Sequence, residues 1–260
     1  MAEPDLRQPT REEEAQAEHE QHKHPLARML LIGFIASAIG VAISLAIDWF
    51  PPQGAESSDD IDTLYDVLLI ASVPIFVLVM TIAIYSVWKF RARPGDMRDG
   101  APIHGNTRLE IIWVTIPFLI VTSLAAYGWI ALDDIEAKKQ NEMTVRVIGQ
   151  QFAWRFEYPQ QGQKAVGSEQ LVLAKDQPVV FRIKSLDVIH SFWVPAFRLK
   201  SDAVPGVGTH VRLTPSRIGT YDVVCAELCG LGHSTMRQTV RVVPREEFDR
   251  WLADRRSKEQ

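Results

Sequence analysis

Hydrophobic and polar positions divide the chain into regions of different kinds. Three apolar runs contain no charged residue, and they cover 29–47, 67–88 and 111–132. A helix needs about 20 apolar residues to cross the hydrocarbon core of a membrane, whereas helices of soluble proteins are rarely uncharged on every face over such a length. The pattern therefore predicts three membrane-spanning helices within a transmembrane region at 29–132.

The basic residues between the runs predict the orientation of these helices. The connection between the first two runs has six acidic residues and no Lys or Arg, whereas the next connection has five basic residues. Four more basic residues lie in the polar segment 1–28. Because cytoplasmic loops are enriched in Lys and Arg, we expect a cytoplasmic tail at 1–28 and an outer location after Leu132. A cleaved signal peptide is an alternative for the first run, but its length favours a retained helix.

Beyond the third run the apolar period changes to two, which is typical of β-strands. Apolar and polar residues alternate in short segments between Pro, Gly and Asp, namely TVRVIGQQFAWRFEY, VVFRIKS, HVRLTP, TYDVVCA and MRQTVRVV. This spacing predicts an all-β sandwich or barrel at 133–244. The segment 245–260 predicts a closing amphipathic helix with Phe248, Trp251 and Leu252 on one face.

Charge and cysteine content exclude several classes of protein. A net charge of −4 argues against a nucleic-acid-binding protein, and two cysteines are too few for a disulfide scaffold or a four-cysteine zinc site. The region after Leu132 has 19 Lys and Arg against 16 Asp and Glu, which is a net charge of +3. The outer domain is therefore slightly basic.

Both cysteines lie in one short segment, CAELCGLGHSTM, at 225–236. The thiolates of Cys225 and Cys229, the imidazole of His233 and the thioether of Met236 are soft ligands of the kind that copper prefers. The upstream segment HSFWVP provides His190 as the natural second histidine. A disulfide, or a zinc site of two Cys and two His, is the alternative, but neither explains the whole order of Cys, Cys, His and Met. Because two thiolates can bridge two ions, the pattern favours a dinuclear copper site.

Three segments, DVIHSFWVP, LKSDAVPG and CAELCGLGHSTM, resemble subunit II of haem-copper oxidases, the cytochrome c oxidase subunit that carries the dinuclear CuA centre. The resemblance covers roughly 61–254 and implies a cupredoxin-like Greek-key barrel after the membrane helices. It implies a multi-pass protein of the bacterial cell membrane with the CuA domain on the outer face. Electrons from cytochrome c would pass through this chain to the haems of subunit I, where oxygen is reduced to water with proton translocation. The expected partners are subunits I and III, cytochrome c and membrane lipid, with no nucleic acid and no catalytic residue in this chain.

The resemblance also implies the metal ligands. One copper would be held by His190, Cys225, Cys229 and Met236. The other would be held by Cys225, Cys229, His233 and the backbone carbonyl of Glu227. The side chain of Glu227 resembles the family's ligand to a magnesium ion at the interface with subunit I.

Two further segments match features of the family. RLEIIWVTIP places Glu110 at the cytoplasmic mouth of a proton channel, although an acid favoured by the helix dipole is the simpler interpretation. GQQFAWRFEYP matches the aromatic stretch through which electrons enter, although it also fits an ordinary strand. Phe152 stands where the family usually has Trp, and Trp154 keeps the second aromatic place.

The basic outer domain departs from the acidic face expected for a strongly basic donor. We therefore expect a cytochrome c donor that is tethered or not strongly basic. Two other functions compete: subunit II of a CuA-type nitric oxide reductase, and a copper-free subunit II of a quinol oxidase.

Overall fold

The computed structural model describes residues 26–91, 105–160 and 163–258. Nearly all of the polar tail predicted at 1–28, and most of the basic connection after the second helix, lie outside the described residues. The chain divides into two compact units, which are described separately. One contains α2 (Leu26–Ala46) and the part of α3 (Ser58–Lys89) from Leu69 onward; the other contains the rest of the described chain.

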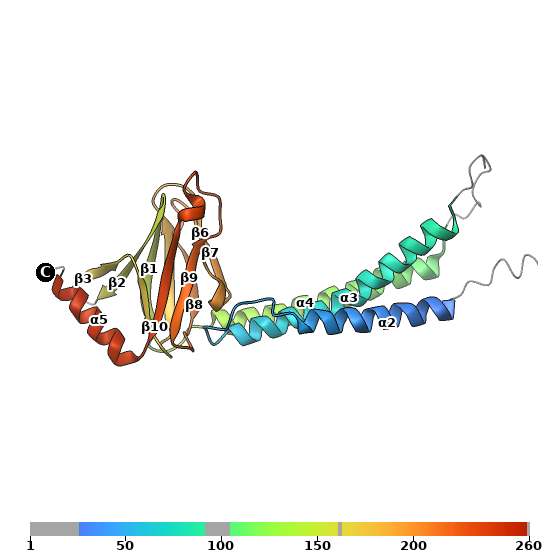
Figure 1. Ribbon diagram of the computed structural model, residues 1–260, viewed down its shortest axis with the longest axis horizontal. Coiled ribbons are helices and arrows are strands. Elements are labelled where there is room, and N and C mark those ends of the chain that lie inside the picture. Colours follow the sequence, from blue (N-terminus) through green and yellow to red (C-terminus); the bar gives the residue numbers. More distant parts are fainter. Residues whose placement is uncertain (1–25, 92–104, 161–162, 259–260) are drawn as a thin grey trace, which may run out of the picture. The chain divides into compact units, whose positions relative to one another are not determined.

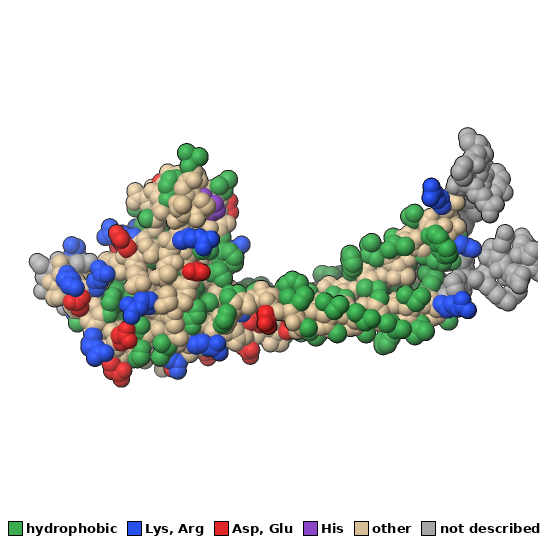
Figure 2. All heavy atoms as spheres, viewed as in Figure 1, with side chains coloured by type: hydrophobic (Ala, Val, Ile, Leu, Met, Phe, Trp, Pro, Cys, Tyr) green, Lys and Arg blue, Asp and Glu red, His purple; other side chains and the backbone are tan. Residues whose placement is uncertain are grey.

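All three long helices have the length and composition of membrane spans. On the face shown in Figure 2, hydrophobic side chains lie along the length of the helical part, with tan backbone and other side chains between them. In the first unit, a Cβ atom added to Gly40 of α2 would lie 2.8 Å from Cγ1 of Val73 on α3. The missing side chain at Gly40 therefore lets the two helices approach closely, as small residues do between membrane helices.

Two of the helices are longer than the charge-free runs. α3 begins at Ser58 rather than near residue 67, and α4 covers Thr107–Glu136 rather than 111–132. Acidic residues fill the first turn of α3, where they interact favourably with the helix dipole. The side chain of Asn106 caps α4 by accepting hydrogen bonds from the backbone N–H groups of Arg108 and Leu109. Polar ends thus extend both helices beyond their apolar parts.

The β domain is built from two five-stranded sheets (Figure 1). The first has the order β3-β2-β1-β5-β8, and the second has the order β4-β10-β9-β6-β7. β1 pairs with β5 and β4 pairs with β10 in parallel, while all other pairs between these strands are antiparallel. The strands are β1 (Met143–Gln150), β2 (Ala153–Gln160), β3 (Gln163–Ser168), β4 (Leu171–Ala174), β5 (Val179–Ser185), β6 (His190–Val194), β7 (Leu199–Ala203), β8 (Thr209–Leu213), β9 (Gly219–Cys225) and β10 (Arg237–Val243).

Alternate residues of these strands face a shared core. β5 shows this alternation most clearly, with Phe181 and Ile183 buried and Arg182 and Lys184 exposed between them. The C-terminal helix α5 (Arg245–Lys258) lies within the segment 245–260 for which a closing helix is predicted, and it contacts β3 and β4. Its buried Phe248 belongs to the same core cluster as the strand residues.

The connection between α2 and α3 is built into the β domain, which the sequence did not predict. Ala55 forms an isolated bridge with Pro215, and the backbone N–H of Gly54 donates to the carbonyl of Ala196 at 2.8 Å. Near the start of α3, both carboxylate oxygens of Asp62 accept hydrogen bonds of 2.7 Å from the guanidinium of Arg198. The acidic connection is therefore not simply a solvated loop.

Candidate metal centre

Residues 225–236, here called the metal loop, join β9 to β10. The loop is closed at its base, because the backbone N–H of Cys225 donates to the carbonyl of Met236 at 3.1 Å. Inside the loop, the short 3-10 helix η2 (His233–Thr235) is preceded by a hydrogen bond of 3.1 Å from the N–H of His233 to the carbonyl of Gly230. Gly230 has φ +131°, a backbone conformation that favours glycine. These contacts fold twelve residues into a compact turn.

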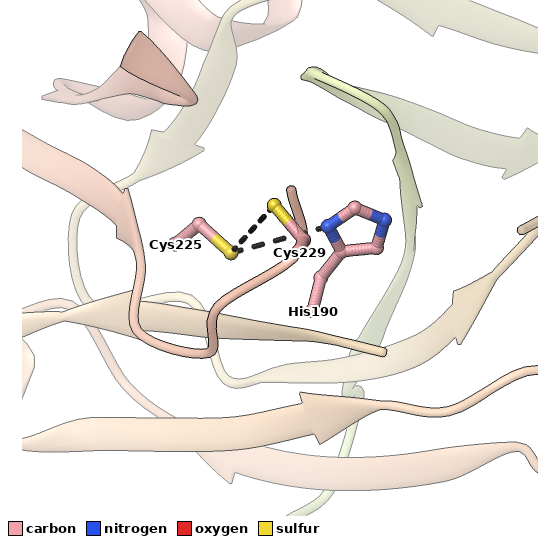
Figure 3. Close-up of side chains that lie close together, drawn as sticks. All are labelled: His190, Cys225 and Cys229. Atoms are coloured by element: carbon pink, nitrogen blue, oxygen red, sulfur yellow. Dashed lines mark hydrogen bonds between the residues drawn. The ribbon is translucent and has the colours of Figure 1, made fainter. Parts of the chain in front are cut away.

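His190 reaches this loop through strand pairing. β6 and β9 are antiparallel, with Phe192 opposite Cys225, and the N–H of Ala226 donates to the carbonyl of Ser191 at 3.0 Å. His190, at the start of β6, therefore lies beside the beginning of the metal loop. The ligand-bearing atoms of His190, Cys225 and Cys229 all lie within 4.8 Å of one another and could hold a metal ion (Figure 3).

All six residues predicted to bind metal converge on this place. Sγ of Cys225 lies 3.9 Å from Nδ1 of His190, 3.9 Å from Sγ of Cys229 and 3.3 Å from the carbonyl oxygen of Glu227. Sγ of Cys229 lies 3.7 Å from Nδ1 of His233 and 3.8 Å from Sδ of Met236. The two thiols are free, and their separation is far longer than the roughly 2.05 Å of a disulfide bond.

The centre is shielded from solvent. His190 and Met236 are completely buried, both cysteines are buried and His233 is half-buried. Burial, together with the neighbouring Cys225, raises the pKa of the Cys229 thiol to about 11. A buried pair of thiols is costly to ionise unless a cation compensates the charge.

Asp187 holds the imidazole of His190 from the other side. Its Oδ1 lies 2.8 Å from Nε2 of His190, and its Oδ2 accepts a 2.7 Å hydrogen bond from the backbone N–H of Gln151. Desolvation alone would raise the pKa of Asp187, but hydrogen bonds from Gln151, His190 and Val188 lower it to about 2. A carboxylate on one imidazole nitrogen leaves the other free for a metal, which is the usual outer-shell arrangement around ligating histidines.

The two aromatic residues of GQQFAWRFEYP occupy different environments. Phe152 is 38% exposed, and its ring lies against the metal loop, where a Cβ atom added to Gly232 would be 2.5 Å from the ring. Trp154 is 1% exposed and makes an edge-to-face contact with His190 at a centroid distance of 5.9 Å. Gly149 makes room for this contact, since an added Cβ would lie about 3 Å from both rings. Trp154 is thus a core residue behind the centre, and only Phe152 is accessible from solution.

The side chains of two predicted residues lie apart from the cluster. The side chain of Glu227 is exposed, although its carbonyl oxygen faces Cys225. Glu110 lies in the first turn of α4, where its Oε1 accepts a 3.2 Å hydrogen bond from the N–H of Asn106. This bond completes a reciprocal cap at the helix N-terminus.

Gln151 and Asp187 are neighbours of the site that the sequence did not predict, because a hydrogen bond between residues 36 positions apart produces no local sequence pattern. The D-x-x-H spacing before His190 was the available signal for Asp187.

Models of known protein families match most of the chain. The family model for "Cytochrome C oxidase subunit II, periplasmic domain" matches residues 163–243, and the corresponding transmembrane-domain model matches residues 40–130. Cytochrome c oxidase subunit 2 of Synechocystis sp. is 31% identical, with 84% of this chain and 81% of the relative covered. The chain belongs to the cytochrome c oxidase subunit II family.

Other members are similar to the same degree. Subunit 2 of Thermostichus vulcanus is 32% identical, with 82% of each chain covered. Among solved structures, the periplasmic domain of subunit II of Bradyrhizobium japonicum is 27% identical and covers 46% of this chain and 97% of that domain, at a TM-score of 0.43.

Family membership, the three apolar helices and the two facing sheets confirm the predicted fold class, a membrane-helical region followed by a cupredoxin-like β domain. The chain is a membrane-bound subunit of the oxidase complex and associates with other oxidase subunits. His190, Cys225 and Cys229 are its candidate copper-binding residues.

Proposed function

We propose that this chain carries a dinuclear CuA centre, accepts electrons there from a cytochrome c and relays them to the haems of subunit I. The observation that carries the proposal is the convergence of two thiols, two imidazoles, one thioether and one carbonyl within hydrogen-bond distances. This set fits copper, since thiolate and thioether are soft ligands and methionine is a poor ligand for zinc. A copper-free quinol oxidase subunit would not need these metal ligands.

The chain's own residues determine how the pair of ions would be held. Cys225 and Cys229 would hold both ions; His190 and Met236 would complete one site, and His233 with the carbonyl of Glu227 the other. A copper pair held in this way would supply one-electron transfer with little structural change on reduction. Burial of the ligands would exclude water, and the bond from Asp187 would fix the ring of His190.

Electrons would enter at Phe152. Its ring is 38% exposed and lies against Gly230 and Gly232 of the metal loop, so it would connect a docked donor to the loop that carries the ligands. Trp154, being buried, would act behind the centre rather than in contact with the donor.

The surroundings of Phe152 favour a donor that is not strongly basic. Leu228 and Leu231 are exposed apolar residues of the metal loop, whose glycines lie against the ring of Phe152. The nearby acid Asp187 already binds Gln151 and His190 with its two oxygens. Together with the net charge of +3, this supports docking through apolar contact to a tethered or neutral cytochrome c domain. Stopped-flow reduction tests this: the rate should change little with salt, and a steep fall with rising salt would refute it.

The remaining assignments follow from the proposed orientation, with the N-terminus in the cytoplasm of a bacterial cell and the β domain outside. Glu227, whose side chain is exposed, would then offer a carboxylate to a magnesium ion shared with subunit I. Glu110 would lie on the cytoplasmic side at the mouth of a proton channel while also capping α4.

A copper count on the full chain purified in detergent tests the central proposal. We expect two copper ions per chain and the purple absorption of a mixed-valence pair. A single copper, bound zinc or a Cys225–Cys229 disulfide would contradict it. Oxygen and nitric oxide consumption by the purified complex then separates an oxidase from a nitric oxide reductase.

A further inference from the structure

Gln151 connects three parts of the candidate metal centre. It lies in the turn between β1 and β2, immediately before Phe152. Its backbone N–H donates to Oδ2 of Asp187 at 2.7 Å, and its side-chain Nε2 donates to the carbonyl oxygen of Cys229 at 2.7 Å. One residue therefore connects the aromatic turn to the segments that carry His190 and Cys229.

The missing side chain at Gly230 of the metal loop leaves room for the side chain of Gln151. Gly230 has a positive φ, and a Cβ atom there would lie 3.0 Å from Nε2 of Gln151 and 3.2 Å from the ring of Phe152. A side chain at Gly230 would therefore compete with both neighbours. The peptide after Cys229 is thus held by a hydrogen bond on its carbonyl and by an aromatic ring on the adjacent glycines.

We propose that Gln151 is a positioning residue, which fixes the metal loop and the Asp187–His190 pair in register with Phe152. It touches no ligand atom directly, and its two bonds act through Cys229 and Asp187. The Nε2 bond restrains Cys229, whose sulfur lies close to both Cys225 and Met236. Losing this restraint would let the metal loop open more often, so that copper would leave faster and the geometry around Cys229 would vary.

Gln151→Ala removes the side-chain bond but keeps the backbone bond to Asp187. Gln150→Ala is the matched control, since Gln150 is an exposed glutamine next to it. In the full chain in detergent, we expect a copper chelator to remove copper about tenfold faster from the Gln151 variant than from the control. We also expect an altered visible spectrum and an unchanged melting temperature of the metal-free chain. Unchanged release and spectrum, or effects that merely follow a lower melting temperature, would overturn the proposal.

Gln151→Glu gives a second test with nearly the same volume. It replaces the N–H donor by a carboxylate oxygen that faces the Cys229 carbonyl, so release should be at least as fast as in Gln151→Ala. An effect smaller than that of Gln151→Ala would contradict the role of this bond.

The inference rests on the proposed function only for its copper measurements. In the metal-free chain, the rate at which a maleimide labels the two thiols reports on opening of the metal loop. We expect about fivefold faster labelling for Gln151→Ala than for Gln150→Ala, the factor that one lost hydrogen bond gives. If the wild type bound no copper, the proposed function would fail, while equal labelling of the two variants would separately refute the positioning role.

Discussion

Two regions of the β domain bury polar groups in opposite ways. Beside α5, the phenol of Tyr158 donates a 3.0 Å hydrogen bond to the carbonyl of Val172 and accepts a 2.8 Å bond from its N–H. Phe248 and Trp251 of α5 pack around the same ring, at centroid distances of 6.2 and 5.1 Å. The buried hydroxyl of Tyr158 thus both donates and accepts a hydrogen bond within the chain, and aromatic rings of α5 contact its ring.

At the metal loop, by contrast, the chain brings together groups that do not satisfy one another. Sulfur atoms of two cysteines and a methionine lie 3.8 and 3.9 Å apart, and sulfur is a weak hydrogen-bond partner. Behind them, Nε1 of Trp154 is buried without a hydrogen-bond partner among the described residues. Natural proteins break local rules of this kind mainly at functional sites. The α5 region is therefore closed by its own contacts, whereas the metal loop leaves buried groups that a bound ligand would satisfy.

Replacing Cys229 by Ser should produce the largest effect, because it removes a bridging sulfur from the second region. Copper should fall from two ions per chain to one or none, with loss of the purple spectrum and a drop in affinity above about 100-fold. Metal analysis and visible spectroscopy measure this. Met236→Leu is the control, since loss of a weak axial ligand should shift the reduction potential and retain the metal. A purple two-copper spectrum in the Ser variant would show that Cys229 is not a ligand.

Replacing Phe248 by Ala should damage the first region without touching the second. The side chain is almost fully buried against Tyr158 and Trp251, so the cavity should cost about 3–5 kcal/mol in the free energy of unfolding. Urea unfolding of the β domain, followed by tryptophan fluorescence, measures this loss. Arg250→Ala on the exposed face of α5 is the control, with an expected change within about 0.5 kcal/mol. Under native conditions the Ala variant should still bind two copper ions; loss of copper would mean that the regions are not separable.

The sequence predicts the membrane helices better than it predicts the strands. The helices could be recognised from runs without charge, but Asn106 extends α4, and the acidic first turn extends α3 beyond the apolar part. β3 (QKAVGS) and β4 (LVLA) show little or no alternation, since β4 is buried at every residue. Such strands cannot be recognised from an alternation of apolar and polar residues.

The metal loop was predictable because its ligands are chemically distinctive and lie within twelve residues. His190 is 35 residues from Cys225. The segment HSFWVP offered it as the natural second histidine and the resemblance gave it a place in the ligand set, but no local pattern shows that β6 brings it beside the metal loop. The bonds of Gln151, and the docking of Gly54 and Ala55 on the β domain, arise from backbone and amide groups that every sequence contains. Such contacts are determined only by the completed fold.

Replacing Tyr158 by Phe tests how much the two buried hydrogen bonds of its hydroxyl contribute to the stability of the α5 region. The backbone N–H and C=O of Val172 would lose a buried partner, which should cost about 1–3 kcal/mol in the free energy of unfolding. Tyr221→Phe is the matched control, because the Tyr221 hydroxyl only donates to the Arg217 carbonyl at a more exposed position. Urea unfolding should show a clearly smaller loss in the free energy of unfolding for the control. Equal losses would contradict a larger contribution from the buried hydrogen bonds of Tyr158.

The smallest effect concerns alkaline pH. Burial raises the pKa of Tyr158 well above its ordinary value of about 10, because the charged form would lose its hydration. A raised pKa in the folded state contributes stability below the unfolded pKa, and this contribution is lost as pH rises from there towards the folded pKa. Above about pH 10, Tyr158 should therefore reduce the free energy of unfolding by up to about 1.4 kcal/mol per pH unit.

Urea unfolding from about pH 9 to about pH 11 isolates this effect as a difference between the wild type and Tyr158→Phe. The wild type should lose stability more steeply, because its unfolded state releases one proton more. Other groups that ionise in this range, including the cysteine thiols, are present in both proteins and cancel. Parallel curves would mean that Tyr158 ionises in the folded domain as it does in water, and the α5 region would then not be closed to solvent.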